Sequence, residues 1–275
     1  MNELELIVFN VGHGLSVMLR ELPSDYITLI DLGSDENLSP LEYLSKRDLY
    51  ADQVFISHPH ADHISEIEKI TLPEYKPSGL IVQDYDWDDI ISREQPYLRD
   101  KVKALVKVKK IIPNGKYSGD AELRYWEFTP DDAKKIFGDS KYINNSSLGI
   151  IYKWGSFKIA ILGDLETSAL TEFCKNQKFV EYAKGTNLLI APHHGHSSGF
   201  PELWVEKIGK PNLTLISIKE SDPYICKKYQ SPDFNKGVRI NGKTRYTLTT
   251  RDDGSIRVRM RYNKNNEPVW KFDFF

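Results

Sequence analysis

The sequence predicts a mixed α/β fold in one domain over residues 1–275. Its 275 residues, 40% of them hydrophobic and 12% aromatic, are enough to bury a substantial core. Short apolar runs that end in polar residues are typical of buried strands reaching the edge of a sheet, and segments with helical spacing of apolar residues follow them. No linker, repeat or low-complexity tract divides the chain. Residues 83–120 and the turn-rich residues 220–245 are expected to be insertions that cover a site.

The composition restricts the class of protein without indicating an activity. A formal net charge of -2 provides no global positive field, so a polyanionic substrate would have to be held by a local patch or by metal. No stretch approaches the roughly 18 consecutive apolar residues of a spanning helix, and residues 1–10 lack the basic start of a signal peptide. Cys174 and Cys226 have neither metal-ligand spacing nor a disulfide framework, which fits a reducing compartment. We therefore expect a cytoplasmic protein with no membrane partner.

The histidines point to metal chemistry. All seven lie in three short segments, NVGHGLS, SHPHADH and APHHGHSSG, whereas histidines that only pack or face solvent would be scattered along the chain. Histidine is the commonest metal ligand in proteins, so the clustering predicts a metal site. The seven residues are His13, His58, His60, His63, His193, His194 and His196.

The SHPHADH segment joins a predicted strand to a predicted helix. Residues 53–57 have the pattern of a short buried strand, and residues 61–70 carry apolar side chains at helical spacing. His58 and His60 lie two positions apart in an extended turn and can converge on one ion. Zinc, manganese or iron would accept such a ligand set.

A second ion can be bound at the start of the predicted helix by Asp62 and His63. Two neighbouring ions need a shared anionic ligand, and Asp164 can supply it. Residues 157–162 have the pattern of a buried strand, and a helix is expected over residues 166–174, so Asp164 lies at a strand end. The alternative is that Asp164 caps this helix.

Two further strand ends carry polar side chains of the same kind. Residues 187–192 are predicted to form a strand that ends in His193 and His194, either of which can supply the final ligand. Asp31 also ends an apolar run; it can orient a ligand histidine by a hydrogen bond, which is usual at metal sites, or begin a turn. Together these residues predict a site in loops above a sheet.

Several sequence segments carry a resemblance to a known family. LIDLGS, SHPHADH, ILGDLE and APHHGHSSG occur in the order typical of the metallo-β-lactamase fold superfamily, which the chain resembles. More narrowly, FNVGHGLSVML, NNSSLGIIY and PHHG resemble the hydrolase domain attached to the ComEC/Rec2 competence channel and its free-standing relatives. The resemblance covers residues 4–217 and includes a closing strand region over residues 246–275.

The resemblance implies a four-layered αββα sandwich, with mixed β-sheets inside and helices on the outer faces. It also implies a dinuclear centre at one edge, holding two divalent metal ions, zinc or manganese. The ligands of one ion would be His58, His60 and Asp164. The ligands of the other would be Asp62, His63, Asp164 and His194.

The chain departs from the superfamily pattern in two places. Many members have a further histidine between the central motif and the bridging aspartate, where this chain has the segment NNSS. Asn144 and Ser147 of this segment are predicted to bind substrate, while Asn145 or Ser147 can also ligate weakly or orient water. The related domain usually has glutamine at the position of His13, which is also predicted to contact substrate.

The implied centre suggests roles for the remaining polar residues. Two cations lower the pKa of a shared water, so that hydroxide is available near neutral pH. Asp62 can orient that hydroxide as well as bind metal. His193, His196 or Asn145 can donate to the developing oxyanion or protonate the leaving group.

The predicted function is that of a metal-dependent hydrolase, specifically a phosphodiesterase or nuclease acting on DNA, RNA or a nucleotide. One alternative is a carboxylic ester, lactone or thioester hydrolase with the same site. Another is a catalytically silent metal-binding interaction subunit. The basic residues 99–110 and the alternating Arg257, Arg259 and Arg261 can follow a phosphate backbone or form solvated faces.

Overall fold

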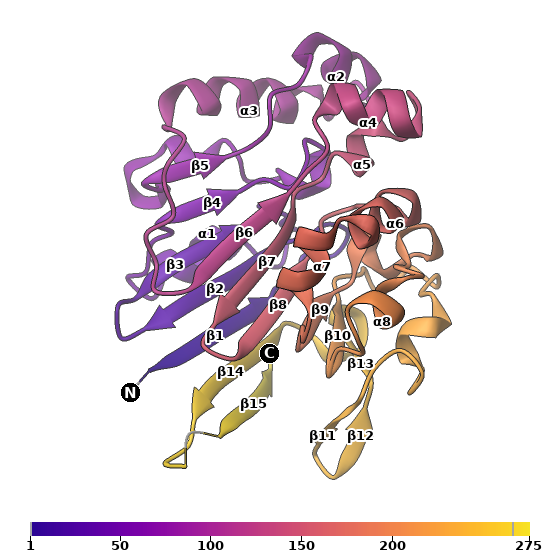
Figure 1. Cartoon of the computed structure of the whole chain (residues 1–275). Coiled ribbons are helices and arrows are strands. Elements are labelled where there is room, and N and C mark those ends of the chain that lie inside the picture. Colours follow the sequence, from indigo (N-terminus) through magenta and orange to yellow (C-terminus); the bar gives the residue numbers. More distant parts are fainter. Residues whose placement is uncertain (1, 266) are drawn as a thin grey trace.

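Two β-sheets stacked face to face form the middle of the molecule in this computed structural model, which describes residues 2–265 and 267–275 (Figure 1). The strands of one sheet are β1 (Glu3–Val8), β2 (Val17–Leu22), β3 (Tyr26–Ile30), β4 (Gln53–Phe55), β5 (Gly79–Ile81), β14 (Ile256–Tyr262) and β15 (Pro268–Phe274). The strands of the other are β6 (Glu122–Trp126), β7 (Gly149–Trp154), β8 (Phe157–Ile161), β9 (Leu188–Ile190), β10 (Leu213–Ile216) and β13 (Thr247–Thr249). Their orders are β15-β14-β1-β2-β3-β4-β5 and β13-β10-β9-β8-β7-β6. A separate hairpin of β11 (Val238–Ile240) and β12 (Lys243–Arg245) projects from the body.

Helices cover the outer face of each sheet. Those against the seven-stranded sheet are α1 (Pro40–Ser45), α2 (Trp87–Arg93), α3 (Arg99–Ile111), α4 (Pro130–Phe137) and α5 (Tyr142–Asn145). Those against the six-stranded sheet are α6 (Thr167–Lys175), α7 (Gln177–Ala183) and α8 (Trp204–Lys207), while α9 (Thr250–Asp253) follows β13. Within the described residues, no helix combines the length and the apolar character needed to cross a bilayer.

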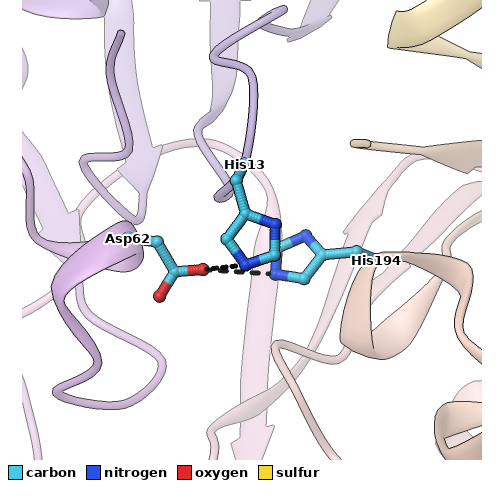
Figure 2. Close-up of side chains that lie close together, drawn as sticks. All are labelled: His13, Asp62 and His194. Atoms are coloured by element: carbon cyan, nitrogen blue, oxygen red, sulfur yellow. Dashed lines mark ion pairs between the residues drawn. The ribbon is translucent and has the colours of Figure 1, made fainter. Parts of the chain in front are cut away.

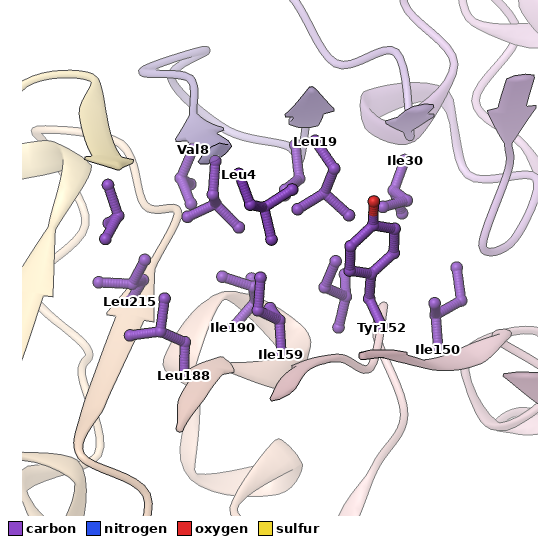
Figure 3. Close-up of a cluster of buried hydrophobic side chains, with 14 of the residues drawn as sticks. Leu4, Val8, Leu19, Ile30, Ile150, Tyr152, Ile159, Leu188, Ile190 and Leu215 are labelled. Carbon is purple, nitrogen blue, oxygen red and sulfur yellow. The ribbon is translucent and has the colours of Figure 1, made fainter. Parts of the chain in front are cut away.

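Three apolar clusters hold these four layers together. Between the sheets, Leu4 and Leu19 pack toward Ile159 and Leu188 (Figure 3). Successive side chains of a strand point to opposite faces, so Leu4 faces the other sheet while Ile7, three positions later, packs under the helices. The central strands are apolar on both faces because both faces are covered. This architecture confirms the predicted four-layered αββα sandwich.

The predicted helix over residues 61–70 is wrong. The segment forms two short 3-10 turns, Ala61–His63 and Lys69–Thr71. The backbone N–H of Leu32 donates to the carbonyl oxygen of His63 at 2.8 Å. In an α-helix that carbonyl would accept from the residue four positions later. Pairing with the loop after β3 therefore overrides the local helical periodicity.

The two segments predicted to cover the site have different structures. Within residues 83–120, α2 and α3 contribute Ile90 and Leu105 to the outer core, so most of this segment belongs to the helical layer. The turn between these two helices, residues 94–98, lines a cavity. Within residues 220–245, the beginning of the segment lines a neighbouring cavity, whereas β11 and β12 form the projecting hairpin.

The basic stretches predicted from the sequence lie on α3 and β14. The Arg257 Nε atom lies 3.0 Å from a carboxylate oxygen of Glu5. A terminal nitrogen of Arg259 lies 2.6 Å from a carboxylate oxygen of Asp273. Acidic partners within the fold thus offset two of the three arginines on this strand.

Candidate metal centre

The ends of neighbouring strands bring the predicted ligands together. Asp31 follows β3, SHPHADH follows β4, Asp164 follows β8 and His194 follows β9. β3 pairs in parallel with β4, and β8 with β9, so their carboxyl ends share an edge. Three of the six described non-glycine residues with positive φ lie here, Asp31 (60°), His193 (50°) and His194 (52°). Such backbone costs about 1–3 kcal/mol per residue, and it persists at functional sites where the surroundings enforce it.

The carboxylate of Asp164 faces two groups of histidine nitrogens. Its Oδ2 atom lies 3.8 Å from His58 Nε2, which lies 2.9 Å from His60 Nδ1. Its Oδ1 atom lies 3.3 Å from His63 Nε2 and 3.6 Å from His194 Nε2. Each oxygen thus faces a different donor group, which is the arrangement required of a carboxylate shared by two ions. The alternative role as a helix cap does not fit, because the cap of α6 is Glu166.

The other ring nitrogens of these histidines are held by hydrogen bonds that fix which nitrogen faces the centre. His63 Nδ1 donates to Asp31 Oδ2 at 2.7 Å. The Ser57 hydroxyl donates to the same carboxylate at 2.7 Å, so its oxygen can accept from His58 Nδ1 at 3.1 Å. His194 Nδ1 lies 3.2 Å from the backbone carbonyl oxygen of Ser217. In His63 and His194 the Nε2 atom is thereby left for a ligand role, as in metal sites generally, while His58 Nε2 lies within hydrogen-bond distance of His60 Nδ1.

Three atoms that face this centre are buried and have no hydrogen-bond partner among the described residues: His63 Nε2, Asp164 Oδ1 and His194 Nε2. Buried polar atoms normally have a hydrogen-bond partner, so three unpartnered atoms around one point require a partner such as a bound ion. Two atoms bonded to one tetrahedral ion at about 2.1 Å lie about 3.4 Å apart, close to the 3.3 and 3.6 Å separations from Asp164 Oδ1. The donor set therefore fits a transition-metal ion.

Burial and neighbouring charge divide the histidines into two classes. Burial lowers the pKa of His58 and of His60, so both rings are neutral near pH 7 and can donate a lone pair. Burial also acts to lower the pKa of His63, but the carboxylates of Asp164 and Asp31 outweigh it and raise that pKa well above its ordinary value. The pKa of His194 is raised in the same way, chiefly by Asp164.

We expect metal binding to release protons. The raised pKa values of His63 and His194 favour the protonated rings in the metal-free protein, and a ring must lose a proton to become a ligand. Affinity should rise about tenfold per pH unit for each proton released, below the raised pKa values. Calorimetric titration with Zn²⁺ in buffers of different ionisation enthalpy measures the number of protons. An affinity that does not change between pH 6 and 8 would contradict the assignment.

Tight packing holds the loop after β8 in place. Gly163 has φ +52°, and a Cβ atom there would lie 2.8 Å from Ser57 Cβ and 2.9 Å from Ser147 Cβ. The fully buried Ser147 accepts the backbone N–H of Asp164 at 3.1 Å through its hydroxyl oxygen. This corrects the prediction that Ser147 contacts substrate, because its hydroxyl positions the backbone of Asp164.

Gly163→Ala is expected to destabilise the protein by about 2–4 kcal/mol, because it adds overpacking to the strain of a positive φ. Gly185→Ala is the matched control, since Gly185 has φ +79° and open space around its Cβ position. Urea denaturation of both variants separates the cost of overpacking from the cost of a positive φ. Equal losses of stability would show that the contact with Ser57 and Ser147 is unimportant.

A cavity of about 240 Å³ opens over the centre. Its lining residues are His13, His60, Asp62, Asn144, Asp164, His193, His194, His196, Asp222 and Tyr224. A second cavity shares His13, His60 and Asp62 with the first and extends to residues 94–98 and Lys219. We call them the inner and the outer cavity.

The structure separates the remaining predicted residues by their access to the inner cavity. Asn144, His193 and His196 line it. Asn145 is fully buried and is not among the lining residues; its Oδ1 accepts the backbone N–H of Glu166 at 3.0 Å. The Nδ2 atom of Asn145 has no hydrogen-bond partner among the described residues, so its role toward a reacting group stays a prediction, whereas Asn144 lines the inner cavity.

Sequence reasoning missed several residues at the site. Ser57 and Ser217 each follow an apolar strand, a signal that also marked Asp31 and could have been applied to them. Tyr97 and Tyr224 line the outer and the inner cavity respectively, and no motif marks them. The folded chain alone places them beside the predicted ligands.

The chain is similar in structure to several known proteins. No protein-family model and no curated protein matches the sequence. Similar solved structures include the metallo-beta-lactamase fold protein YhfI from Bacillus subtilis, with 16% identity, a TM-score of 0.45 and coverage of 79% of this chain and 86% of that one. A diphosphatase from the PhnP family has 15% identity, a TM-score of 0.42 and coverage of 76% and 75%. CmlA, a diiron beta-hydroxylase from Streptomyces venezuelae, has 16% identity, a TM-score of 0.40 and coverage of 76% and 38%. These similarities do not assign an activity.

Proposed function

We propose that this chain is a metal-dependent phosphodiesterase or nuclease with two divalent ions, zinc or manganese. The ligands of the first ion would be His58, His60 and Asp164. The ligands of the second would include Asp62, His63, Asp164 and His194. The similarity of FNVGHGLSVML and NNSSLGIIY to the ComEC/Rec2-type hydrolase domain supports this choice among hydrolases.

One observation supports a metal-dependent activity most strongly: three buried atoms without hydrogen-bond partners converge on one point. These atoms are His63 Nε2, Asp164 Oδ1 and His194 Nε2. A purely structural cluster would pair these atoms with one another or with the backbone. The cavity directly over them gives a small molecule or a chain segment access to the same point. A site that only stabilised the fold would be closed.

The residues around the centre supply the remaining chemistry. When bound, two ions would activate water and neutralise charge on a phosphodiester. Burial lowers the pKa of His193, so its ring is neutral near pH 7 and can donate a hydrogen bond to a substrate oxygen. Asp62 lies 3.5 Å from His194 Nε2 and borders both cavities, where its ionised carboxylate can accept a hydrogen bond or take a ligand position.

Two exposed aromatic rings support a nucleotide or nucleic-acid substrate. Tyr97 is 75% exposed and Tyr224 is 71% exposed, the highest values among the large hydrophobic side chains described. Each lines one of the two cavities that share Asp62. Exposed aromatic rings beside a cationic site are the usual platforms on which bases stack. Lys219 adds a positive charge to the outer cavity, where a phosphate could lie.

A substrate panel tests this proposal. Protein loaded with Zn²⁺ or Mn²⁺ is assayed on single- and double-stranded DNA, RNA, cyclic nucleotides and bis(p-nitrophenyl) phosphate, and in parallel on an aryl ester, a lactone and a thioester. We expect cleavage of phosphodiesters. Turnover of the carbonyl substrates alone would establish an ester hydrolase, and no turnover by metal-loaded protein would favour an interaction subunit.

Removing either ring should weaken binding of base-containing substrates. Tyr97→Ala and Tyr224→Ala are each expected to raise KM for an oligonucleotide about tenfold, because one stacked base contributes about 1–3 kcal/mol. The Phe variants should retain the wild-type KM, since a phenyl ring still stacks. Tyr50→Ala is the control, because Tyr50 is 54% exposed and lines neither cavity. Unchanged KM in both Ala variants would remove this argument for a nucleic-acid substrate.

A further inference from the structure

We propose that His13, from the loop between β1 and β2, is an additional ligand of the second ion. This inference rests on the dinuclear centre proposed above but not on its substrate. Figure 2 shows the His13 ring beside His194, with both rings directed at the carboxylate of Asp62. The three residues come from three separate loops, so the fold alone brings them together.

The distances suit three donors around one ion. His13 Nε2 lies 3.5 Å from Asp62 Oδ2, and His194 Nε2 lies 3.5 Å from the same oxygen. The ligand atoms of all three residues lie within 4.8 Å of one another. Donors on one tetrahedral ion are about 3.4 Å apart. The separations of His13 Nε2 and of His194 Nε2 from Asp62 Oδ2 are therefore those of ligands that share an ion.

The loop that carries His13 packs against the Asp62 loop and is linked to His194 through Ser217. Gly14 has φ +133°, and a Cβ atom there would lie 2.3 Å from the backbone oxygen of Asp62. The Gly14 carbonyl oxygen accepts the Ser217 hydroxyl at 2.7 Å. The backbone carbonyl of that same serine lies 3.2 Å from His194 Nδ1. The backbone next to His13 is thus packed against the backbone of Asp62 and is linked through Ser217 to the residue that orients His194.

With His13 as a ligand, the two ions have unequal numbers of donors and are bound with unequal affinity. The first donor group contains His58, His60 and Asp164, and the chain has no histidine between His63 and Asp164 that could join it. The second group would have one donor more than its four expected ligands. We therefore expect one ion to be held tightly at the second group and the other loosely at the first.

Metal affinity tests this inference without reference to activity. Zn²⁺ affinity of the full chain is measured by chelator competition for wild type, His13→Ala and His13→Gln, and Co²⁺-loaded protein is compared by visible absorption. Both variants should weaken the tighter binding step at least tenfold and change the Co²⁺ spectrum, while the looser step stays unchanged. His196→Ala is the matched control for metal affinity, because His196 lines the same cavity and belongs to none of the donor groups.

Each outcome has a distinct meaning. Unchanged affinities and spectra in both His13 variants would overturn the inference, even if KM for a substrate rose, because His13 would then contact substrate only. Failure of the wild-type protein to bind metal would overturn the dinuclear centre itself. The His13 side chain is 53% exposed, so its replacement should leave the thermal unfolding of metal-free protein unchanged. This control separates loss of a ligand from loss of the fold.

Discussion

Asp164→Asn is expected to abolish hydrolysis and to remove at least one of the two ions. The variant keeps the shape of the side chain but loses the anionic charge that faces both histidine groups, at 3.8 Å from His58 and 3.3 Å from His63. Metal ions supply several kcal/mol of transition-state stabilisation, and each 1.4 kcal/mol changes the rate about tenfold. We expect kcat to fall at least about 1000-fold, measured with saturating metal on the best substrate of the panel.

The Asp164 result needs a control for the substitution itself. Asp131→Asn makes the same change at an exposed carboxylate on α4 and should leave both the rate and the metal content unchanged. Metal analysis of dialysed protein accompanies the kinetics. Wild-type activity in Asp164→Asn, or a full complement of two ions, would contradict a shared carboxylate at this position.

Asp31→Asn is expected to destabilise the metal-free protein by about 3 kcal/mol and to weaken metal binding about 10- to 100-fold. The Asp31 carboxylate is fully buried and accepts hydrogen bonds from the Ser57 N–H, the Ser57 hydroxyl and His63 Nδ1, each at 2.7 Å. An amide cannot accept all three, because one of its two terminal atoms is a donor. Loss of the charge also removes one of the groups that raise the pKa of His63.

The pH dependence of this variant provides a second readout. Because the folded pKa of His63 is raised, its contribution to stability is present below its unfolded pKa and is lost as pH rises through the raised value. The stability difference between wild type and Asp31→Asn in metal-free protein should therefore be largest at low pH and shrink as pH rises. Chemical denaturation between pH 6 and 9 measures it.

The backbone at Asp31 determines the choice of control. Asp31 has φ 60°, a conformation that asparagine tolerates well and alanine does not. Asp48→Asn makes the same substitution at φ 53° on an exposed residue, so it should change neither stability nor metal affinity. Equal behaviour of the Asp31 and Asp48 variants would mean that the Asp31 carboxylate does not orient His63.

The sequence predicted those features that depend on local pattern. A short apolar run followed by a polar residue marks a strand end, and this pattern placed Asp31, Asp164 and His194 on loops that the structure brings to one edge. The strands expected over residues 157–162 and 187–192 correspond to β8 and β9. Parallel pairing brings these strand ends to one edge of the sheet. A sequence pattern can indicate this proximity but does not give the distances between the side chains.

The features that the sequence did not predict are decided by contacts between distant segments. Residues 61–70 have helical periodicity, yet the N–H of Leu32 takes the carbonyl of His63 and the helix does not form. The contact between Gly14 and Ser217 joins residues 203 positions apart, so no local pattern records it. Tyr97 and Tyr224 reach the site for the same reason, since folding alone places their loops beside Asp62.

The metal content of the full chain tests the central claim most directly. Protein purified without chelator and dialysed against metal-free buffer is analysed by elemental analysis, together with Asp164→Asn, and both are assayed for phosphodiester cleavage. We predict close to two equivalents of zinc or manganese in the wild type, with cleavage that disappears along with metal in the variant. A wild-type protein that binds no transition metal when supplied with excess, and unfolds at the same temperature with and without it, would contradict the account.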